Sequence, residues 1–254
     1  MRLEGKVAVI TGAASGMGRA MADLFTKEGA KVVAADWNQE ALDAAVAEVS
    51  AAGGTIVGIQ GNVADQAQAE AIIDKAVETY GKIDILCNNA GVMDNNQGAA
   101  EVTNEMWERV LGINLNGPMY LTRKAIPAMK ASGGGAIVNT ASVAGVGGGA
   151  AGLAYTVSKH GIVGLTKQTA FRYCQEGIRC NAIAAGAVET NIMASVDPTK
   201  MDEAGSARCN TYYAAIPGQL KATDIANLAL FLVSDESSMI NGAIVPADAG
   251  WLSA

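Results

Sequence analysis

The sequence predicts an α/β fold in which helices cover both faces of one doubly wound parallel sheet. Short apolar runs alternate with longer stretches of helical periodicity along the 254 residues. The apolar runs lack polar alternation, which is typical of strands buried on both faces. A glycine-rich segment also follows the first apolar run, where the strand gives way to a helix. Strand–helix alternation with right-handed crossovers produces this architecture.

Seven apolar runs are predicted as strands. They are residues 7–10, 31–35, 55–59, 83–87, 136–139, 178–183 and 243–245. The clearest helical stretches between them are residues 40–50, 66–80 and 224–232. In the first of these, the apolar side chains at 42, 45, 46 and 49 fall on one stripe.

The bulk properties of the chain favour one cytoplasmic domain. Half of the 254 residues are apolar, so the chain can close one large core and a single domain over residues 1–254 is predicted. No apolar run approaches the about 18 residues that span a bilayer, and the first residues lack the apolar core of a signal peptide. The four cysteines show no Cys-x-x-Cys spacing, which favours reduced thiols. The net charge of −7 argues against nucleic acid as a partner, although it also fits a charge that only aids solubility.

The strand–helix rhythm weakens between about residues 190 and 219, where Met, Tyr and Pro residues gather. Long irregular segments within compact domains are often lids or binding loops. We therefore expect a substrate-binding loop region there. An insertion without function is the alternative.

The segment ITGAASGMGRA places Gly12, Gly16 and Gly18 at the junction of strand and helix. Glycine inside a helix costs about 1 kcal/mol relative to alanine, so the backbone there must have another use. Glycines let the backbone approach a pyrophosphate, which the helix N-terminus attracts. Asp36 ends the second strand, near the spacing expected for an acid that holds ribose hydroxyls. A Rossmann-like dinucleotide site is predicted, against the alternative that Asp36 is an ordinary turn residue.

The spacing of these glycines, with Thr11 before them, resembles that of the short-chain dehydrogenase/reductase family. The resemblance covers essentially the whole chain, since further motifs follow in the family's order. They are Asn88-Asn89-Ala90-Gly91, Asn114 in Asn-Leu-Asn-Gly, Ser142 thirteen residues before Tyr155, and Lys159 four residues after it. The resemblance implies a seven-stranded parallel sheet and a homotetramer.

The residues around Asp36 favour NAD(H) as the cofactor. Members of the family that use NADP tend to carry Lys or Arg where this chain has Ser15 and Trp37. The Asp36 carboxylate would face the 2′-phosphate, and two like charges about 4 Å apart cost about 4 kcal/mol at an effective dielectric near 20. Arg19 is a nearby cation, but its place on the helix disfavours contact with that phosphate.

The resemblance also assigns contacts in later loops. Asn62 stands where the family usually has Asp, and its amide oxygen can accept the same bond from adenine. Ala185-Gly186 replaces the family's Pro-Gly, and the backbone of Val188 matches the position that holds the carboxamide. The predicted cofactor residues are Gly12, Ser15, Gly16, Met17, Gly18, Asp36, Trp37, Asn62, Val63, Asn89, Ala90, Gly91, Tyr155, Lys159, Gly186, Val188 and Thr190.

Tyr155 is the predicted acid/base, with Lys159, Ser142 and Asn114 as its partners. Free tyrosine has a pKa near 10, too high for a base at neutral pH. Lys159 lies one helical turn away, and a cation about 4–5 Å from the phenol contributes about 3–4 kcal/mol toward lowering its pKa. Ser142 can donate to a substrate carbonyl oxygen. The resemblance implies that Asn114 kinks its helix and holds a water of a proton relay, and that Lys159 bonds the nicotinamide ribose.

Each of these residues also has a structural interpretation. Tyr155 alone fits a core aromatic, Lys159 a solvated helix face and Ser142 a strand cap, but their joint spacing favours catalysis. His160 points about 100° away from the Tyr155–Lys159 face and is expected to be structural. No cluster of ligand residues predicts a metal site.

The predicted substrate is a hydrophobic or cyclic secondary alcohol or ketone, such as a steroid. Residues 93–96, 143–150 and 190–213 are expected to line the pocket, and the small residues 147–150 suggest room. Only Lys200 and Arg208 are basic in these segments, which disfavours a strongly anionic substrate. The expected apolar lining is Val143, Val146, Leu153, Ile192, Met193 and Tyr212.

Two other functions stay open at this point. One is a 3-oxoacyl-[acyl-carrier-protein] reductase, against which Asp36 and the acidic charge weigh. The other is a non-catalytic NAD-binding regulatory protein, which would not need the full set of four catalytic residues.

Overall fold

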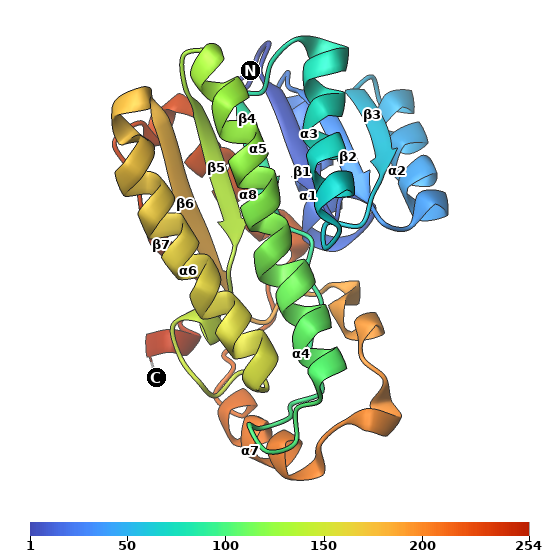
Figure 1. Cartoon of the computed structure of the whole chain (residues 1–254), viewed down its shortest axis with the longest axis vertical. Coiled ribbons are helices and arrows are strands. Elements are labelled where there is room, and N and C mark those ends of the chain that lie inside the picture. Colours follow the sequence, from blue (N-terminus) through green and yellow to red (C-terminus); the bar gives the residue numbers. More distant parts are fainter. Residues whose placement is uncertain (254) are drawn as a thin grey trace.

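A computed structural model describes residues 1–253 and contains one sheet of seven parallel strands (Figure 1). The strand order is β3-β2-β1-β4-β5-β6-β7, so the chain reverses direction across the sheet between β1 and β4. The strands are β1 (Val7–Thr11), β2 (Lys31–Asp36), β3 (Thr55–Gln60), β4 (Ile85–Asn88), β5 (Gly135–Thr140), β6 (Ile178–Ala185) and β7 (Ile244–Ala247). All seven predicted strands are confirmed. β4 starts two residues later than predicted, where the Asp84 carboxylate accepts the backbone N–H of Val7 at 2.7 Å.

Eight α-helices surround the sheet within the described residues. They are α1 (Gly16–Lys27), α2 (Gln39–Ala51), α3 (Gln66–Tyr80), α4 (Asn104–Leu111), α5 (Gly117–Ala131), α6 (Leu153–Tyr173), α7 (Glu203–Tyr213) and α8 (Ala222–Val233). In Figure 1, α3, α5 and α6 lie in front of the sheet.

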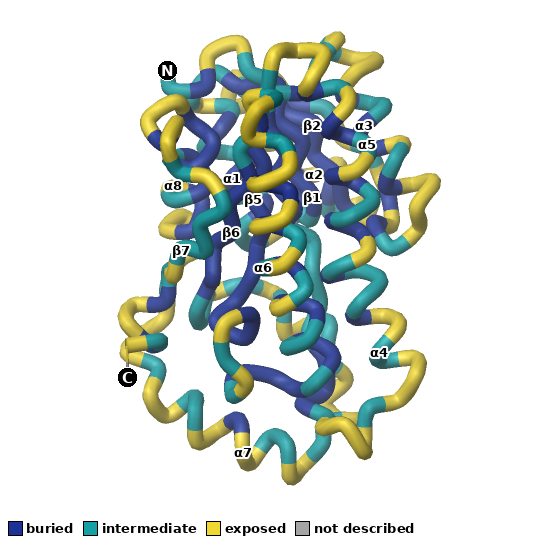
Figure 2. The backbone as a smooth tube through the Cα atoms, turned by 60° about the vertical axis from the view of Figure 1, so that its left-hand side comes forward, coloured by how far each residue is buried: buried dark blue, intermediate teal, exposed yellow. Residues whose placement is uncertain are grey.

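Alternate residues of the strands enter two separate cores. Ala8 and Ile10 of β1 belong to the core that α1, α2 and α8 complete, whereas Val7 and Val9 belong to the core of α3 and α5. Because both faces of the sheet are covered, the inner strands β2, β1, β4, β5 and β6 have continuous apolar runs and lie buried within the molecule (Figure 2), whereas the edge strands β3 and β7 are partly exposed. The predicted two-faced, doubly wound α/β architecture is confirmed.

The segment of about residues 190–219, where the strand–helix alternation weakens, extends beyond the carboxyl edge of the sheet. It contains two short 3₁₀ turns (Asn191–Ser195 and Pro198–Lys200) followed by α7. The sequence did not predict α7, because Cys209 alone among its residues is buried and no apolar stripe marks the helix. Figure 2 shows this helix at the far end of the molecule, largely exposed.

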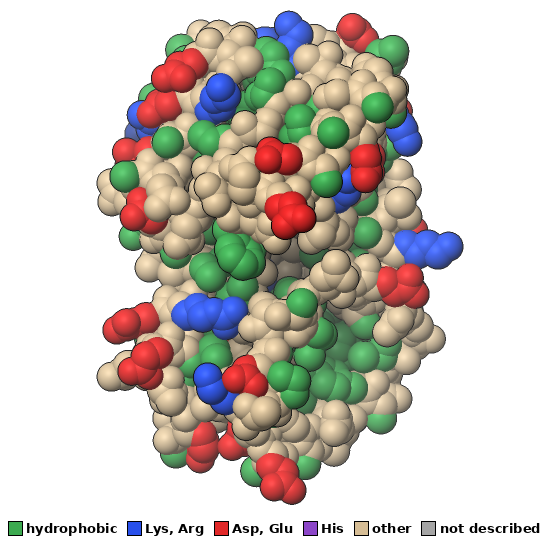
Figure 3. All heavy atoms as spheres, turned by 90° about the vertical axis from the view of Figure 1, so that its right-hand side faces the viewer, with side chains coloured by type: hydrophobic (Ala, Val, Ile, Leu, Met, Phe, Trp, Pro, Cys, Tyr) green, Lys and Arg blue, Asp and Glu red, His purple; other side chains and the backbone are tan. Residues whose placement is uncertain are grey.

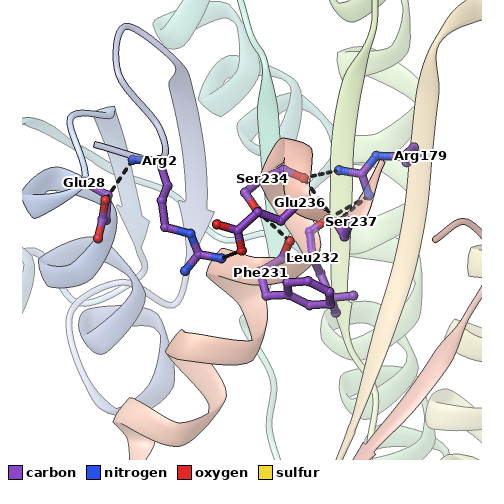
Figure 4. Close-up of polar contacts among 8 residues, drawn as sticks. All are labelled: Arg2, Glu28, Arg179, Phe231, Leu232, Ser234, Glu236 and Ser237. Carbon is purple, nitrogen blue, oxygen red and sulfur yellow. Dashed lines mark hydrogen bonds and ion pairs between the residues drawn. The ribbon is translucent and has the colours of Figure 1, made fainter. Parts of the chain in front are cut away.

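The amino edge of the sheet is held by Arg179, the second residue of β6. Its guanidinium donates to the carbonyl oxygens of Leu232 at 2.9 Å and Ser234 at 3.1 Å, and to the Ser237 hydroxyl at 3.0 Å (Figure 4). These bonds satisfy carbonyls that helix α8 leaves unpaired at its C-terminus, where the helix dipole also favours a cation. Arg179 therefore joins β6 to the end of α8.

No helix within residues 1–253 is both long enough and apolar enough to cross a membrane. Within the same residues, no cluster of three or more His, Cys, Asp or Glu could hold a metal ion. The four cysteines are free; they are Cys87, Cys174, Cys180 and Cys209.

Candidate active site

A cavity of about 1400 Å³ opens at the carboxyl ends of the strands. Its wall comes from the loops after β1, β2, β3, β4 and β5, from the segment between β6 and α7, and from α7 itself. Figure 3 shows that face of the molecule hollowed, with hydrophobic side chains beside the hollow. The cavity lies where the strand order reverses, which is the usual ligand site of an open parallel sheet.

The glycine-rich turn forms one wall of this cavity. Gly12 and Gly16 have φ of +67° and +54°, a backbone conformation that residues with a side chain disfavour. Gly18 does not line the cavity. A Cβ on Gly18 would overlap the Gly12 carbonyl oxygen, so this glycine allows α1 to lie close to the turn. The side-chain amide of Asn89 donates to the Thr11 carbonyl at 3.0 Å and fixes the turn from the neighbouring loop. Exposed backbone at a helix N-terminus fits a pyrophosphate.

Asp36 is buried at the end of β2, and its carboxylate faces this turn. One oxygen accepts the N–H of Ala14 at 3.0 Å and the other accepts the N–H of Asn38 at 3.1 Å. A carboxylate has further lone pairs, so it can still accept ribose hydroxyls. Arg19 is paired with Asp23 at 2.9 Å and with Glu48 at 2.7 Å, which holds it away from the cavity. Among the described residues, Lys159 and Arg109 are the cations that line the cavity.

The remaining predicted cofactor residues come together from distant parts of the chain. Trp37 stands at the rim with 74% of its surface exposed, and the Asn62 side chain accepts the N–H of Ala64 at 3.0 Å. Thr190 lies against the glycine turn, since an added Cβ on Gly16 would sit 3.2 Å from its methyl group. All predicted cofactor residues except Gly18 line the cavity; they are Gly12, Ser15, Gly16, Met17, Asp36, Trp37, Asn62, Val63, Asn89, Ala90, Gly91, Tyr155, Lys159, Gly186, Val188 and Thr190.

Tyr155 and Lys159 lie on the same face of α6, as the spacing predicts. The Lys159 ammonium is 5.4 Å from the centroid of the Tyr155 ring and donates to the Thr140 carbonyl at 2.7 Å. Ser142 follows β5 and lines the same cavity as Tyr155, where its side chain acts to lower the pKa of the phenol. All three side chains are buried in the cavity wall. His160 is exposed and contacts the Thr156 carbonyl at 3.0 Å, away from this group.

The pKa of Tyr155 differs from the prediction made for it. Burial raises the pKa of Tyr155 to about 12, a hydrogen bond with Ser142 opposes this, and the Asp94 carboxylate raises the pKa further. Burial lowers the pKa of Lys159 to about 8. The chain's own residues therefore do not bring the phenol into the neutral range, because desolvation outweighs the opposing effect of Ser142.

Asn114 lies behind this group and does not line the cavity. It occurs in a π-helical turn (Gly112–Asn116) between α4 and α5, so the regular α-helix is interrupted where the kink is predicted. Its amide accepts the N–H of Val92 and donates to the Val92 carbonyl, both at 2.9 Å. The same amide donates to the Ser158 hydroxyl at 3.3 Å. Asn114 thus ties the loop after β4 to α6, and its role in a water relay stays a prediction.

The apolar side of the cavity only partly matches the predicted lining. Val143, Ile192 and Met193 line it as predicted, but Val146, Leu153 and Tyr212 do not. Val146 faces outward, with 45% of its surface exposed. Tyr212 instead packs on Trp251, with ring centroids 4.7 Å apart, and an added Cβ on Gly149 would lie 3.0 Å from the Tyr212 ring. Gly149 therefore accommodates Tyr212, and of the small residues 147–150 only Ala150 lines the cavity.

Within the predicted 190–213 segment, Tyr213 lines the cavity in place of Tyr212, and its hydroxyl donates to the Ala150 carbonyl at 3.1 Å. Other cavity residues were missed from the sequence. Trp251 reaches the cavity from the end of the chain, and Arg109 reaches it from α4. Arg109 also donates to the Ser195 carbonyl at 3.1 Å. No periodic pattern marks these residues, since each enters the cavity through contacts with a distant segment.

The fold and this cavity define a class of protein. A doubly wound sheet with a glycine turn at its switch point, an acid after β2 and a Tyr–Lys pair beside the cavity is the arrangement of an oxidoreductase that uses a nicotinamide dinucleotide.

Comparison with known proteins gives the family. A family model described as "Enoyl-(Acyl carrier protein) reductase" matches residues 12–252. The chain is 43% identical over 250 residues to 3β-hydroxysteroid dehydrogenase 2 of Eggerthella lenta, covering 98% of this chain and 95% of that protein. It is 39% identical over 252 residues to the 3-oxoacyl-[acyl-carrier-protein] reductase FabG of Thermotoga maritima, covering 98% and 99%. The chain belongs to the short-chain dehydrogenase/reductase family and is an oxidoreductase.

Solved structures agree with this assignment. The crystal structure of levodione reductase superposes over all of both chains with a TM-score of 0.89 and 36% identity. An NAD(P)-dependent gluconate 5-dehydrogenase of Beutenbergia cavernae, with NADP bound at low occupancy, gives a TM-score of 0.87 and 34% identity. That alignment covers 99% of this chain and 98% of the other.

Proposed function

We propose that this chain transfers a hydride between NAD(H) and a hydrophobic or cyclic secondary alcohol or ketone. The observation that carries the proposal is the buried group of Tyr155, Lys159 and Ser142 in the wall of a cavity that the glycine turn also lines. A phenol, an ammonium and a hydroxyl beside one cavity can handle the proton of an alcohol while the cofactor handles the hydride.

The cavity residues can be assigned to successive parts of the cofactor. The Gly12–Gly16 turn would hold the pyrophosphate, Asp36 the adenosine ribose, and Asn62 with Val63 the adenine. Val188 and Thr190 would hold the carboxamide end, next to Lys159. Held there, an oxidised nicotinamide would supply a hydride acceptor and a positive charge near the phenol.

The protein residues would move the proton. In oxidation, the Tyr155 oxygen takes the proton of the substrate hydroxyl; in reduction, it returns that proton to the carbonyl oxygen. Ser142 donates a hydrogen bond to the same substrate oxygen and stabilises the charge that develops on it. Because burial raises the pKa of Tyr155 to about 12, the cationic neighbours must lower it in the loaded enzyme.

Substitution at Tyr155 tests the proposal directly. Tyr155→Phe keeps the ring and removes the proton donor, so we expect ketone reduction to fall by about 10²–10⁴-fold. The loss of NADH absorbance with a panel of cyclic and aliphatic ketones measures this. An active wild type and an equally active Tyr155→Phe protein would contradict the assignment. If both proteins bind NADH but turn over no ketone, the non-catalytic alternative is favoured.

The preference for NAD over NADP is the second part of the proposal. Asp36 supports it, because no cation of the cavity lies beside that carboxylate and Arg19 is held in ion pairs. We expect Asp36→Ala combined with Trp37→Arg to shift the ratio of kcat/KM toward NADPH by about a hundredfold or more. Arg19→Ala is the control and should leave the ratio unchanged. A wild-type protein that already prefers NADPH would overturn this part.

The apolar side chains of the cavity and the names of the relatives support the proposed substrate class. Val143, Ile192, Met193 and Trp251 line the same cavity as Tyr155. The relative from Eggerthella lenta is named for a hydroxysteroid, and this chain shares 43% of its aligned residues. A panel that contains 3-oxo steroids, small cyclic diones and aliphatic ketones distinguishes among these classes by kcat/KM.

Reduction of a 3-oxoacyl thioester is the second candidate. The FabG relative and the acyl-carrier description of the family model favour it. A kcat/KM for a 3-oxoacyl thioester above that for every cyclic ketone would select it over the first candidate. A homotetramer and a cytoplasmic location complete the proposal, and light scattering of the purified protein tests the oligomeric state.

A further inference from the structure

Helix α6, which carries Tyr155, begins without a capping side chain of its own. Its N-cap residue is Gly152, which has no side chain to accept the N–H groups of the first turn. Such groups must find partners, since unpaired N–H groups in a buried helix end are costly. For α6 these partners come from another part of the chain.

The buried carboxylate of Asp94, in the loop after β4, takes over the capping. One oxygen accepts the N–H of Gly152 at 3.0 Å, and the other accepts the N–H of Tyr155 at 2.9 Å. The Gln97 carbonyl accepts the N–H of Leu153 at 2.8 Å. Asp94 is only 1% exposed, and its first oxygen also accepts the N–H of Asn96 at 3.1 Å. The backbone of the proposed acid/base is therefore bonded directly to this carboxylate.

The same short segment, residues 94–97, also holds the start of α7. The Asn95 carbonyl accepts the N–H of Asp202, the N-cap of α7, at 2.9 Å. The Asn96 side chain donates to the Ser206 hydroxyl at 3.3 Å. Asn96 has φ of +57°, which turns the segment between the two helices.

Two glycines confirm how closely these parts approach. An added Cβ on Gly152 would lie 2.7 Å from the Asp94 carboxylate, and one on Gly205 would overlap the Asn96 carbonyl oxygen. Neither helix could approach the 94–97 segment with a side chain at these positions. The segment is thus packed between α6 and α7 on both sides.

We propose that Asp94 is a positioning residue for Tyr155, and that residues 94–97 couple the placement of α7 over the substrate to the placement of the acid/base. This inference rests on the proposed role of Tyr155. Asp94 fixes the backbone of Tyr155, whereas Asn96 fixes α7 relative to the same segment. The two effects can therefore be separated by substitution.

Asp94 also acts on Tyr155 through its charge. The other groups near the phenol are Lys159 from α6, Ser142 after β5 and Tyr213 from α7, and Cys209 of α7 lies near Tyr213 and Asp94. The Asp94 carboxylate raises the pKa of Tyr155, so an uncharged replacement lowers that pKa.

Asp94→Asn, compared with Asp84→Asn, tests the positioning role. Asp84 is the matched control, because its carboxylate accepts a backbone N–H at the opposite edge of the sheet. In Asp94→Asn we expect kcat to fall at least tenfold. The pH at which alcohol oxidation is half-maximal should fall by about one unit, because a negative charge is removed near the phenol. In Asp84→Asn, kcat should stay within about twofold of the wild-type value, and the pH of half-maximal oxidation within about 0.2 units. An unmoved pH midpoint in Asp94→Asn, or an equal kcat loss in both variants, overturns the role.

Hydrogen exchange supplies a readout that needs no turnover. We expect the amides of Gly152 and Tyr155 to exchange at least tenfold faster in Asp94→Asn than in the wild type, and to be unchanged in Asp84→Asn. Unchanged exchange in Asp94→Asn overturns the inference even if no substrate is found. An inactive wild type with the expected exchange pattern would instead count against the proposed function alone.

Asn96→Gly tests the coupling to α7. Glycine tolerates the positive φ and removes only the bond to Ser206. We expect KM for the ketone to rise several-fold with the pH midpoint unchanged, and faster exchange at the start of α7. If KM and exchange are both unchanged, the coupling is wrong. Should Asp94→Asn fail to fold, exchange in the wild type decides the role of Asp94: the amides of Gly152 and Tyr155 should be strongly protected, and exchange as fast as that of unbonded amides would overturn it.

Discussion

The two edges of the sheet use their charged groups differently. At the amino edge, the Arg179 guanidinium spreads its bonds over three groups at the end of α8 (Figure 4). At the carboxyl edge, the Lys159 ammonium is buried beside a phenol and donates to the Thr140 carbonyl. Burial lowers the pKa of Lys159 to about 8, so its charge is held at a cost. The amino edge therefore stabilises the fold, whereas the carboxyl edge keeps a destabilised ammonium beside the residues proposed for catalysis.

The largest expected effect on stability is at the amino edge. Arg179→Ala removes the guanidinium that donates to the carbonyls of Leu232 and Ser234. We expect the free energy of unfolding to fall by about 4 kcal/mol, because charge-assisted bonds to a helix C-terminus are lost. Urea denaturation measures this, and NADH affinity should stay the same.

Arg2→Ala is the control at the same edge. Arg2 forms an ion pair with Glu236, but the two side chains are 32% and 57% exposed. An exposed pair contributes at most about 1 kcal/mol, so this variant should unfold nearly as the wild type does. Equal losses for Arg2→Ala and Arg179→Ala would contradict the assigned role of Arg179.

The next effect is a pH dependence at the carboxyl edge. The pKa of Lys159 falls from 10.5 to about 8 in the folded chain, which corresponds to about 3 kcal/mol. The unfolded chain binds more protons between these values, so the stability of the wild type rises with pH across that window and the penalty is complete below pH 8. Lys159→Met lacks this group. Its stability relative to the wild type should be greatest near pH 7 and should decline toward pH 10.5.

Denaturation series at pH 7, 8.5 and 10 measure this difference. Lys27→Met, at an exposed lysine near the end of α1, is the control and should show no such trend. A constant difference between Lys159→Met and the wild type over this range would mean that the ammonium is not destabilised by burial.

The smallest of these effects concerns the glycine turn. In Gly18→Ala the added methyl group meets the Gly12 carbonyl oxygen, so α1 must move away from the turn. We expect NADH affinity to fall by about ten- to a hundredfold, or about 1–3 kcal/mol, through misplaced N–H groups. Fluorescence titration with NADH measures it. An unchanged affinity would show that the close approach of helix and turn is not needed for binding.

Much of the fold could be predicted because it depends on local patterns. Strands such as β1 and β6 are buried on both faces and therefore read as apolar runs. Tyr155 and Lys159 are four residues apart on one helix, so their shared face followed from helical geometry. In contrast, α7 buries Cys209 alone and has no apolar stripe to reveal it. The choice of Tyr213 over Tyr212 as the cavity residue depended on the position of Trp251, which is far along the chain.

The sequence by itself determined the sheet, the glycine turn and the shared face of Tyr155 and Lys159, since each is encoded within a few turns or one strand of chain. Only the tertiary structure decided the electrostatic state of Tyr155 and the support of its helix. Burial raises the pKa of the phenol to about 12, and the cap of α6 comes from Asp94, nearly sixty positions earlier. Desolvation of a side chain and capping by a distant residue depend on which segments meet in space. The spacing of residues along the sequence does not predict those contacts.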